Sequence, residues 1–299
     1  MGPVAGRQVQ PHPGTVATPS GARWKAPLLA LPVVVLMLVG AVWVGQQSFV
    51  YHPARTPVPP VADRLPGARE VALRTADGLD LGAWWLPPSG GCRAAVLLAH
   101  GNGGNRASRA ALAQALNEHG FGVLMFDYRG YGGNPGRPTE AGLARDVRAA
   151  RSYLLDEAGI EERDLVYLGE SLGTGVVSEL AVEHPPAALV LRSPLTSLDE
   201  VGHSLYRVPV GWLLRDRYLV RENVGRLGMP TAVVYGTEDA IVPAAQSRDV
   251  AQTARQAGAE VVEVEVPGAG HNDDVLVEGQ ALVDAVVAVA VRGGVRGCR

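Results

Sequence analysis

Residues 164–175 read DLVYLGESLGTG, and this stretch decides the fold. Its first half is a short apolar run, typical of a strand buried on both faces of a sheet, and the small residues after it predict a helix. Between them, Gly169-Glu170-Ser171-Leu172-Gly173 matches the G-x-S-x-G pattern, in which a sharp turn raises the serine hydroxyl above the sheet. The helix that follows directs free N–H groups toward this hydroxyl. Ser171 is therefore predicted to be a nucleophile.

Strands and helices alternate on both sides of this turn. A hairpin is predicted at 69–86, around Ala76-Asp77-Gly78, followed by strands at 94–100, 121–127, 164–170, 187–193, 231–237 and 260–266 and by helices at 106–119, 139–157, 172–183, 243–258 and 274–292. Such alternation predicts an α/β fold with a mostly parallel sheet and helices on both faces. Ligands of these sheets bind at the carboxyl ends of the strands.

A serine becomes a useful nucleophile when a base removes its proton. After a G-x-S-x-G serine, the acidic residue comes next along the chain and the histidine follows it. His184, His203 and His271 are the histidines after Ser171. His184 ends the helix after the turn and His203 lies between two strands. His271 follows the strand at 260–266 in a glycine-containing loop, so it is predicted to be the base.

The acidic partner of the histidine is expected directly after the strand at 231–237. Glu238 and Asp239 both stand there, and Asp239 is preferred. Its carboxylate would orient the imidazole and stabilise the imidazolium cation. Glu238 is an alternative on spacing alone, and Asp199, after the strand at 187–193, is a further alternative.

Residues 100–104 read HGNGG and follow the strand at 94–100. A glycine-rich loop at this place supplies one N–H of an oxyanion hole, and the residue after the nucleophile supplies the other. The backbone N–H groups of Asn102 and Leu172 are therefore predicted to be the donors, with His100 as an orienting residue. The sequence has no HExxH, no G-x-G-x-x-G after the first strand and no P-loop lysine motif, so neither a metal nor a cofactor is expected.

Residues 27–45 (PLLALPVVVLMLVGAVWVG) carry no charge and are long enough to span about 30 Å of hydrocarbon. They are predicted to be a transmembrane helix after a disordered tail, 1–26. A cleaved signal peptide is the alternative, but the run is long for one and no A-x-A site follows it. Arg23 and Lys25 precede the run, which places the tail in the cytoplasm and the following domain outside.

The rest of the chain divides into a Pro-rich linker, a catalytic domain and a short tail. The expected bounds are 46–68 for the linker, 69–292 for the domain with a cap at about 194–230, and 293–299 for the tail. The net charge of −3 and 19% of charged residues give no basic footprint for nucleic acid. Cys92 and Cys298 lack the spacing of a metal or redox site and are interpreted as two unrelated thiols. A disulfide is the alternative, if the domain lies outside the cytosol.

Several motifs together resemble the α/β-hydrolase superfamily, and within it the abhydrolase-domain-containing serine hydrolases with an N-terminal membrane anchor. They include HGNGGN (100–105), GESLGTG (169–175), GTEDAIVP (236–243), GAGHND (268–273) and QQSFVYHP (46–53), which resembles the start of the family's catalytic domain. The resemblance implies an eight-stranded sheet and a Ser171–Asp239–His271 triad. It favours Asp239 over Glu238.

The expected reaction is a two-step acyl transfer through an acyl-enzyme, without a cofactor, on a small-molecule or lipid acyl ester or thioester. A serine peptidase of the same fold and a non-catalytic membrane-anchored binding protein are the alternatives. Apolar side chains in 205–220 are expected to seal the cap or to roof an acyl pocket. They are Leu205, Tyr206, Val208, Val210, Trp212, Leu213, Leu214 and Leu219.

Overall fold

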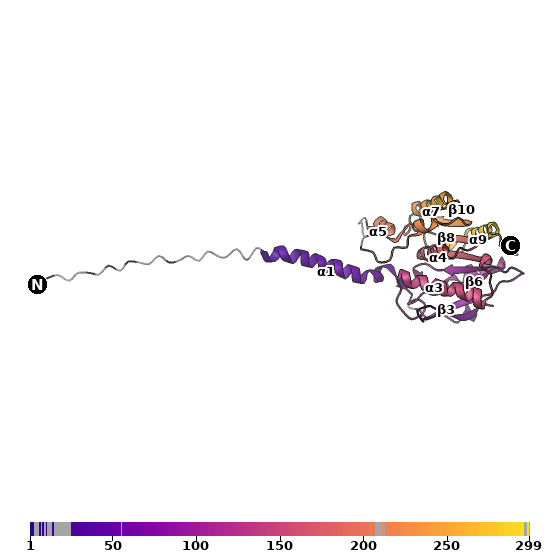
Figure 1. Cartoon of the computed structure of the whole chain (residues 1–299), viewed down its shortest axis with the longest axis horizontal. Coiled ribbons are helices and arrows are strands. Elements are labelled where there is room, and N and C mark those ends of the chain that lie inside the picture. The colour runs from indigo at the N-terminus through magenta and orange to yellow at the C-terminus, as the bar shows by residue number, and fades with distance from the viewer. Residues whose placement is uncertain are drawn as a thin grey trace. The chain divides into compact units, whose positions relative to one another are not determined.

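The computed structural model describes residues 25–54, 56–206, 211, 213–295 and 298, with a few isolated positions before residue 25. The side chains of residues 25–31, 38, 42, 205 and 206 are not described. The chain divides into two compact units, Met1–Val44 and Gly45–Arg299 (Figure 1).

Helix α1 (Lys25–Val50) contains the predicted apolar run and continues past its expected end at residue 45. Its stretch Pro32–Val50 has a mean hydropathy of 1.9, and only 6% of it is buried by protein. Apolar side chains of this helix such as Leu36 and Val44 are each 70% exposed. The helix is therefore long and apolar enough to cross a membrane, a property that signal sequences share.

The second unit is built on an eight-stranded sheet in the order β10-β9-β8-β7-β4-β6-β3-β2. The strands are β2 (Arg69–Arg74), β3 (Asp80–Leu86), β4 (Ala95–Ala99), β6 (Gly122–Phe126), β7 (Leu165–Glu170), β8 (Ala188–Arg192), β9 (Thr231–Gly236) and β10 (Val261–Val266). Strand β3 pairs antiparallel with β2 and β6, and every other neighbouring pair is parallel. The prediction of a mostly parallel eight-stranded sheet is confirmed.

Helices cover both faces of this sheet. They are α2 (Ala110–Glu118), α3 (Glu140–Ser152), α4 (Leu172–Glu183), α5 (Leu198–Tyr206), α6 (Val220–Val224), α7 (Ala244–Gln256), α8 (Asp274–Val277) and α9 (Gln280–Arg292), with single turns at Val61–Asp63, Arg106–Arg109, Tyr153–Glu157 and Glu162–Asp164. Leu97 of β4 packs in one core with α3, α4 and α7, whereas its neighbour Leu98 packs in the other core with α2 and α9. Successive residues of β4 thus point into opposite cores, which explains why the central strands are apolar throughout.

The segment 46–68 is not a free linker as the sequence suggested. A small second sheet joins β1 (His52–Pro53) to β5 (Gly103–Gly104) in parallel. Tyr51 and Leu65 are buried in the domain, 4% and 1% exposed. The segment is therefore packed against the domain at these positions.

Cys92 and Cys298 form a disulfide, with their Cα atoms 4.8 Å apart. The interpretation as two unrelated thiols is thus wrong, and a disulfide is present. Cys92 precedes β4 and Cys298 follows α9, and both side chains lie in the same apolar core. The bond ties the end of the domain to the start of its first central strand.

The predicted cap corresponds to the chain between β8 and β9, which contains α5 and α6. Residues 207–210 and 212 lie outside the described residues, so Val208, Val210 and Trp212 of the expected roof do too. Leu213, Leu214 and Leu219 are half-buried. The apolar roof remains a prediction.

Candidate active site

Ser171 lies in the turn between β7 and α4, as the sequence predicts. Its φ is +50°, in the left-handed region that a side chain disfavours. The turn is held by two hydrogen bonds, from the Ser171 N–H to the Arg192 carbonyl at 2.8 Å and from the Thr174 N–H to the Ser171 carbonyl at 2.9 Å. Ser171 occupies the N-cap position of α4 but its hydroxyl makes no capping bond. The hydroxyl is therefore left for chemistry.

The two glycines of the motif permit close backbone contacts on either side of the serine. A Cβ on Gly169 would lie 2.5 Å from the Gly173 carbonyl oxygen, and one on Gly173 would overlap the Ala99 carbonyl oxygen. Helix α4 can therefore start directly against the carboxyl end of β4. This contact brings the helix N-terminus to the edge of the sheet where the loops carry polar residues.

His271 and Asp239 come from the loops after β10 and β9 and meet at that edge. The His271 Nδ1 lies 2.6 Å from the Asp239 Oδ2. The Asp239 Oδ1 accepts backbone N–H bonds from Ile241 at 2.9 Å and Val242 at 2.8 Å. Burial acts to raise the pKa of Asp239, but the His271 contact and these N–H groups together hold it below its ordinary value. Asp239 therefore stays ionised and can hold a proton on the His271 Nδ1.

Ser171 and His271 line one open pocket of about 590 Å³, and Asp239 lies behind His271, 7% exposed. The structure thus brings together the three residues that the sequence selected. Glu238, which the spacing also allowed as the acid, has an exposed side chain. His184 lies 3.3 Å from Glu183 at the end of α4.

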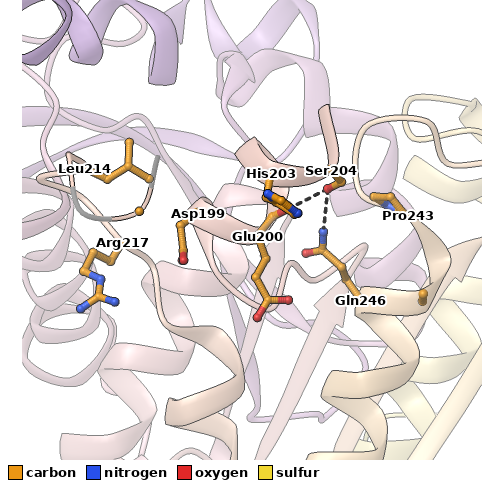
Figure 2. A pocket seen from close by; sticks show the side chains of 10 residues that line it. Asp199, Glu200, His203, Ser204, Leu214, Arg217, Pro243 and Gln246 are labelled. Carbon is orange, nitrogen blue, oxygen red and sulfur yellow. Dashed lines mark hydrogen bonds between the residues drawn. The ribbon is translucent and has the colours of Figure 1, made fainter. Parts of the chain in front are cut away.

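Asp199 and His203 line a separate cavity of about 920 Å³ that includes none of the three selected residues. Figure 2 shows this cavity between α5 and the start of α7. There the Gln246 side chain donates to the Ser204 hydroxyl across 3.3 Å. Of the expected roof, Leu214 alone lines the cavity among the described residues. Its lining also carries charged side chains from α5, so it is not a purely apolar chamber.

The loop after β4 places Asn102 in the wall of the Ser171 pocket. Within the described residues the Asn102 N–H donates no hydrogen bond, so it is available to a ligand. The Leu172 N–H also has no intrahelical acceptor, because the first residue of a helix has no helical carbonyl one turn before it. His100 is buried beneath the loop, with its ring 4.5 Å from that of Tyr128. This placement is consistent with the supporting role expected for His100.

Sequence reasoning missed a buried charge cluster beneath the pocket. Glu170 is fully buried. Its Oε2 accepts a hydrogen bond from the Arg109 Nε at 2.5 Å, and the Arg192 Nη2 lies 3.8 Å from the same oxygen. Arg192 in turn donates to the His271 carbonyl at 2.8 Å. Burial acts to raise the pKa of Glu170, but the two arginines lower it overall. The available signal was a charged residue at the end of each of two apolar strands, because such charges need partners.

Fold and site together define an α/β hydrolase, and the chain belongs to the α/β-hydrolase superfamily. The family model described as "Serine aminopeptidase, S33" matches residues 90–218. The uncharacterized protein Rv2307c of Mycobacterium tuberculosis is 46% identical over 86% of this chain and 93% of its own length. YfhR of Salmonella typhi is 30% identical over 69% of this chain and 75% of its own.

Some of the more distantly similar proteins have names that state a function. The lysophosphatidylserine lipase ABHD12 of Danio rerio is 30% identical over 57% of this chain and 54% of its own length. Among solved structures, the Pyrococcus furiosus esterase Pf2001 has a TM-score of 0.66 at 21% identity over 81% of this chain and 98% of its own. A puromycin-hydrolyzing peptidase of Mycobacterium tuberculosis has a TM-score of 0.62 at 19% identity over 76% of this chain and 39% of its own. The two structures support the fold alone.

Proposed function

We propose that the chain is a membrane-anchored serine hydrolase that cleaves an acyl ester or thioester through an acyl-enzyme. The observation that carries the proposal is the hydrogen bond between Asp239 and His271, because His271 lines the same pocket as Ser171, whose hydroxyl makes no capping bond. Because the Asp239 carboxylate is an acceptor, the proton of a neutral His271 ring lies on Nδ1. Nε2 is then the basic atom that can take the proton of Ser171.

In the first step the Ser171 oxygen attacks the acyl carbonyl, and His271 receives its proton. The carbonyl oxygen becomes an oxyanion, stabilised by the N–H groups of Asn102 and Leu172. His271 then returns the proton to the leaving group. In the second step it activates water, which hydrolyses the acyl-enzyme and restores Ser171.

The pocket around Ser171 is suited to a substrate with polar groups next to the scissile carbonyl. Its walls include the polar side chains of His52, Asn102, Ser108, Arg109, Arg192 and Asn272. An acyl ester with a polar leaving group, such as a lysophospholipid, fits this lining, and the name of the zebrafish relative points the same way. We therefore favour an ester or thioester over a peptide bond.

A fluorophosphonate probe tests the reaction class. The wild-type chain should be labelled, and Ser171→Ala should lose both labelling and hydrolysis of p-nitrophenyl esters without a lower melting temperature. Labelling that persists in Ser171→Ala would overturn the nucleophile. Faster turnover of aminoacyl-p-nitroanilides than of any ester would instead identify a peptidase, and a folded chain inert to both would indicate a binding protein.

The helix α1 is proposed to remain as an anchor, with the catalytic domain outside the cytoplasm. The disulfide supports a location of the domain outside the cytoplasm, because such bonds persist in oxidising compartments. Protein washed with alkali should stay with membranes, and external protease should digest the domain in spheroplasts. A soluble product beginning near Gln46 would show a cleaved signal peptide, and a protected domain would show the opposite orientation.

A further inference from the structure

Residues Gln46–Pro53 comprise the last residues of α1, Tyr51 and β1, and we call them the lead-in segment. They lie wholly within the second unit of the chain. This segment contacts two parts of the domain that are far away in sequence: the loop around Asn102 and the chain that returns from the cap at 213–218. The reaction outlined above gives it no role.

The first contact holds Asn102. The His52 N–H donates to the Asn102 Oδ1 at 3.2 Å, and the Asn102 Nδ2 donates to the His52 Nδ1 at 3.0 Å. Pairing of His52 with Gly103 continues the contact as a two-stranded parallel sheet. The Tyr131 hydroxyl donates to the Asn102 carbonyl oxygen at 3.1 Å and lies 2.9 Å from its Oδ1. Both polar side-chain atoms and the carbonyl of Asn102 thus have hydrogen-bond partners, whereas its N–H donates to no acceptor in the part of the chain that the structure describes.

This pattern fixes the direction in which the Asn102 peptide points. A glycine lies on each side of Asn102, so the backbone there has little intrinsic stiffness. Among the described residues, His52 and Tyr131 hold the Asn102 side chain in its orientation. Burial raises the pKa of the Tyr131 hydroxyl, which therefore stays protonated and remains a donor. His52 supplies the remaining contacts, and it lines the same pocket as Ser171.

The second contact keeps the lead-in segment itself in place. The Tyr51 hydroxyl lies 2.7 Å from the Asp216 Oδ2 and 2.7 Å from the Tyr218 hydroxyl, and the Tyr51 side chain is buried in the core. The Gln46 Oε1 accepts the Arg215 N–H at 2.8 Å. Strand β1, which reaches Asn102, is therefore held at its N-terminal side by one buried and two partly buried hydrogen bonds that do not involve the Asn102 loop.

We propose that the lead-in segment positions the oxyanion hole, with His52 acting as a positioning residue through the side chain of Asn102. This rests on the proposed function, since it requires the Asn102 N–H to be an oxyanion donor. His52 carries no reacting atom. Its loss should weaken stabilisation of the transition state more than binding of the ground state, and should therefore lower kcat and leave KM nearly unchanged.

The test uses the full chain and p-nitrophenyl butyrate, with kcat and KM measured separately. In His52→Leu we expect kcat to fall about five- to tenfold, because one exposed side-chain hydrogen bond to Asn102 is lost while the Asn102 N–H itself remains. KM should stay within about twofold. His52→Asn should recover most of kcat, because its Oδ1 can replace the Nδ1 acceptor. Ser48→Ala, at an exposed position of the same segment, is the matched control.

A double-mutant cycle separates positioning from a general structural effect. If His52 acts only through Asn102, His52→Leu should cost nothing further in the Asn102→Ala background. The inference would be overturned if the losses of kcat in the two single variants added up in the double variant. It would also be overturned if kcat were unchanged in His52→Leu, or if His52→Asn lowered kcat as much as His52→Leu does. If His52→Leu but not His52→Asn lowered the melting temperature while both variants had the same kcat, the role of His52 would be structural and the inference would be wrong. Failure of the proposed function is distinct, since the wild type would then escape the fluorophosphonate probe.

Discussion

The pair of Asp239 and His271 offers a variant whose effects on activity and on stability should separate. In Asp239→Asn the amide oxygen can still accept the N–H groups of Ile241 and Val242 that Oδ1 now accepts at 2.9 and 2.8 Å. The amide NH₂ then occupies the place of Oδ2, 2.6 Å from the His271 Nδ1. Because that group donates, it selects the tautomer with the proton on Nε2, and Nε2 can no longer act as a base.

The magnitudes differ widely between the two properties. Loss of the correct tautomer in a Ser–His–Asp triad lowers kcat by about 10⁴, roughly 5 kcal/mol of transition-state stabilisation. Asp239→Asn should nevertheless melt within a few degrees of the wild type. Asp239→Ala leaves two N–H groups without an acceptor, one of them fully buried. That should cost about 2–4 kcal/mol, or about 5–15 °C in melting temperature.

The assay is kcat/KM on p-nitrophenyl butyrate beside a thermal melt for each variant. Glu238→Gln is the matched control, because Glu238 is the neighbouring carboxylate and its side chain is exposed. The activity of this variant should stay within about twofold of the wild type. More than a tenth of wild-type activity in Asp239→Asn would refute the role of Asp239. A large loss in Glu238→Gln would transfer that role to its neighbour.

Other outcomes concern stability. Ser171→Gly should abolish labelling yet raise the free energy of unfolding by about 1 kcal/mol in a urea titration, because glycine relieves the positive φ; an unchanged value would mean that the turn is unstrained. Reduction of the disulfide between Cys92 and Cys298, which closes a loop of 206 residues, should cost about 2–5 kcal/mol, and identical melts with and without dithiothreitol would contradict this. The pKa of Glu170 is lowered in the fold, so its stabilising contribution is complete above about pH 5 and is lost as the pH falls below its ordinary value near 4.3. Acid unfolding followed by circular dichroism should show that loss of stability. Glu170→Gln should lower the free energy of unfolding by about 3–5 kcal/mol at pH 7 and should make that free energy depend less steeply on pH in acid. An acid dependence as steep as that of the wild type would assign the loss to other groups.

Much of the fold and of the candidate site was predictable because it is encoded locally. The apolar runs and the glycines around Ser171 specify a strand, a turn and a helix within a dozen residues. Asp239 and His271 follow the ends of two further strands. Since parallel strands bring their carboxyl ends to one edge of the sheet, these residues could be placed together without knowing any contact.

Long-range partners were not predictable in this way. Nothing in the sequence around His52 states that it pairs with the loop at Asn102, because a two-residue strand has no periodicity to detect. The charge of Glu170 in a buried strand predicts that a partner exists, but several arginines could supply it. The prolines of 46–68 suggested a linker because proline stiffens both a free chain and one lying on a surface.

The bond between Cys92 and Cys298 makes a covalent ring of the chain between them, and Ser171, Asp239 and His271 all lie inside it. A protease that cuts one peptide bond within this ring opens it without releasing a fragment, so these three residues stay covalently linked to one another. A cut between α1 and Cys92 instead breaks the covalent link between α1 and the ring. In an oxidising compartment, a single proteolytic cut can therefore break the covalent link between the apolar helix and the ring, but it cannot place the three residues of the proposed triad on two unlinked fragments.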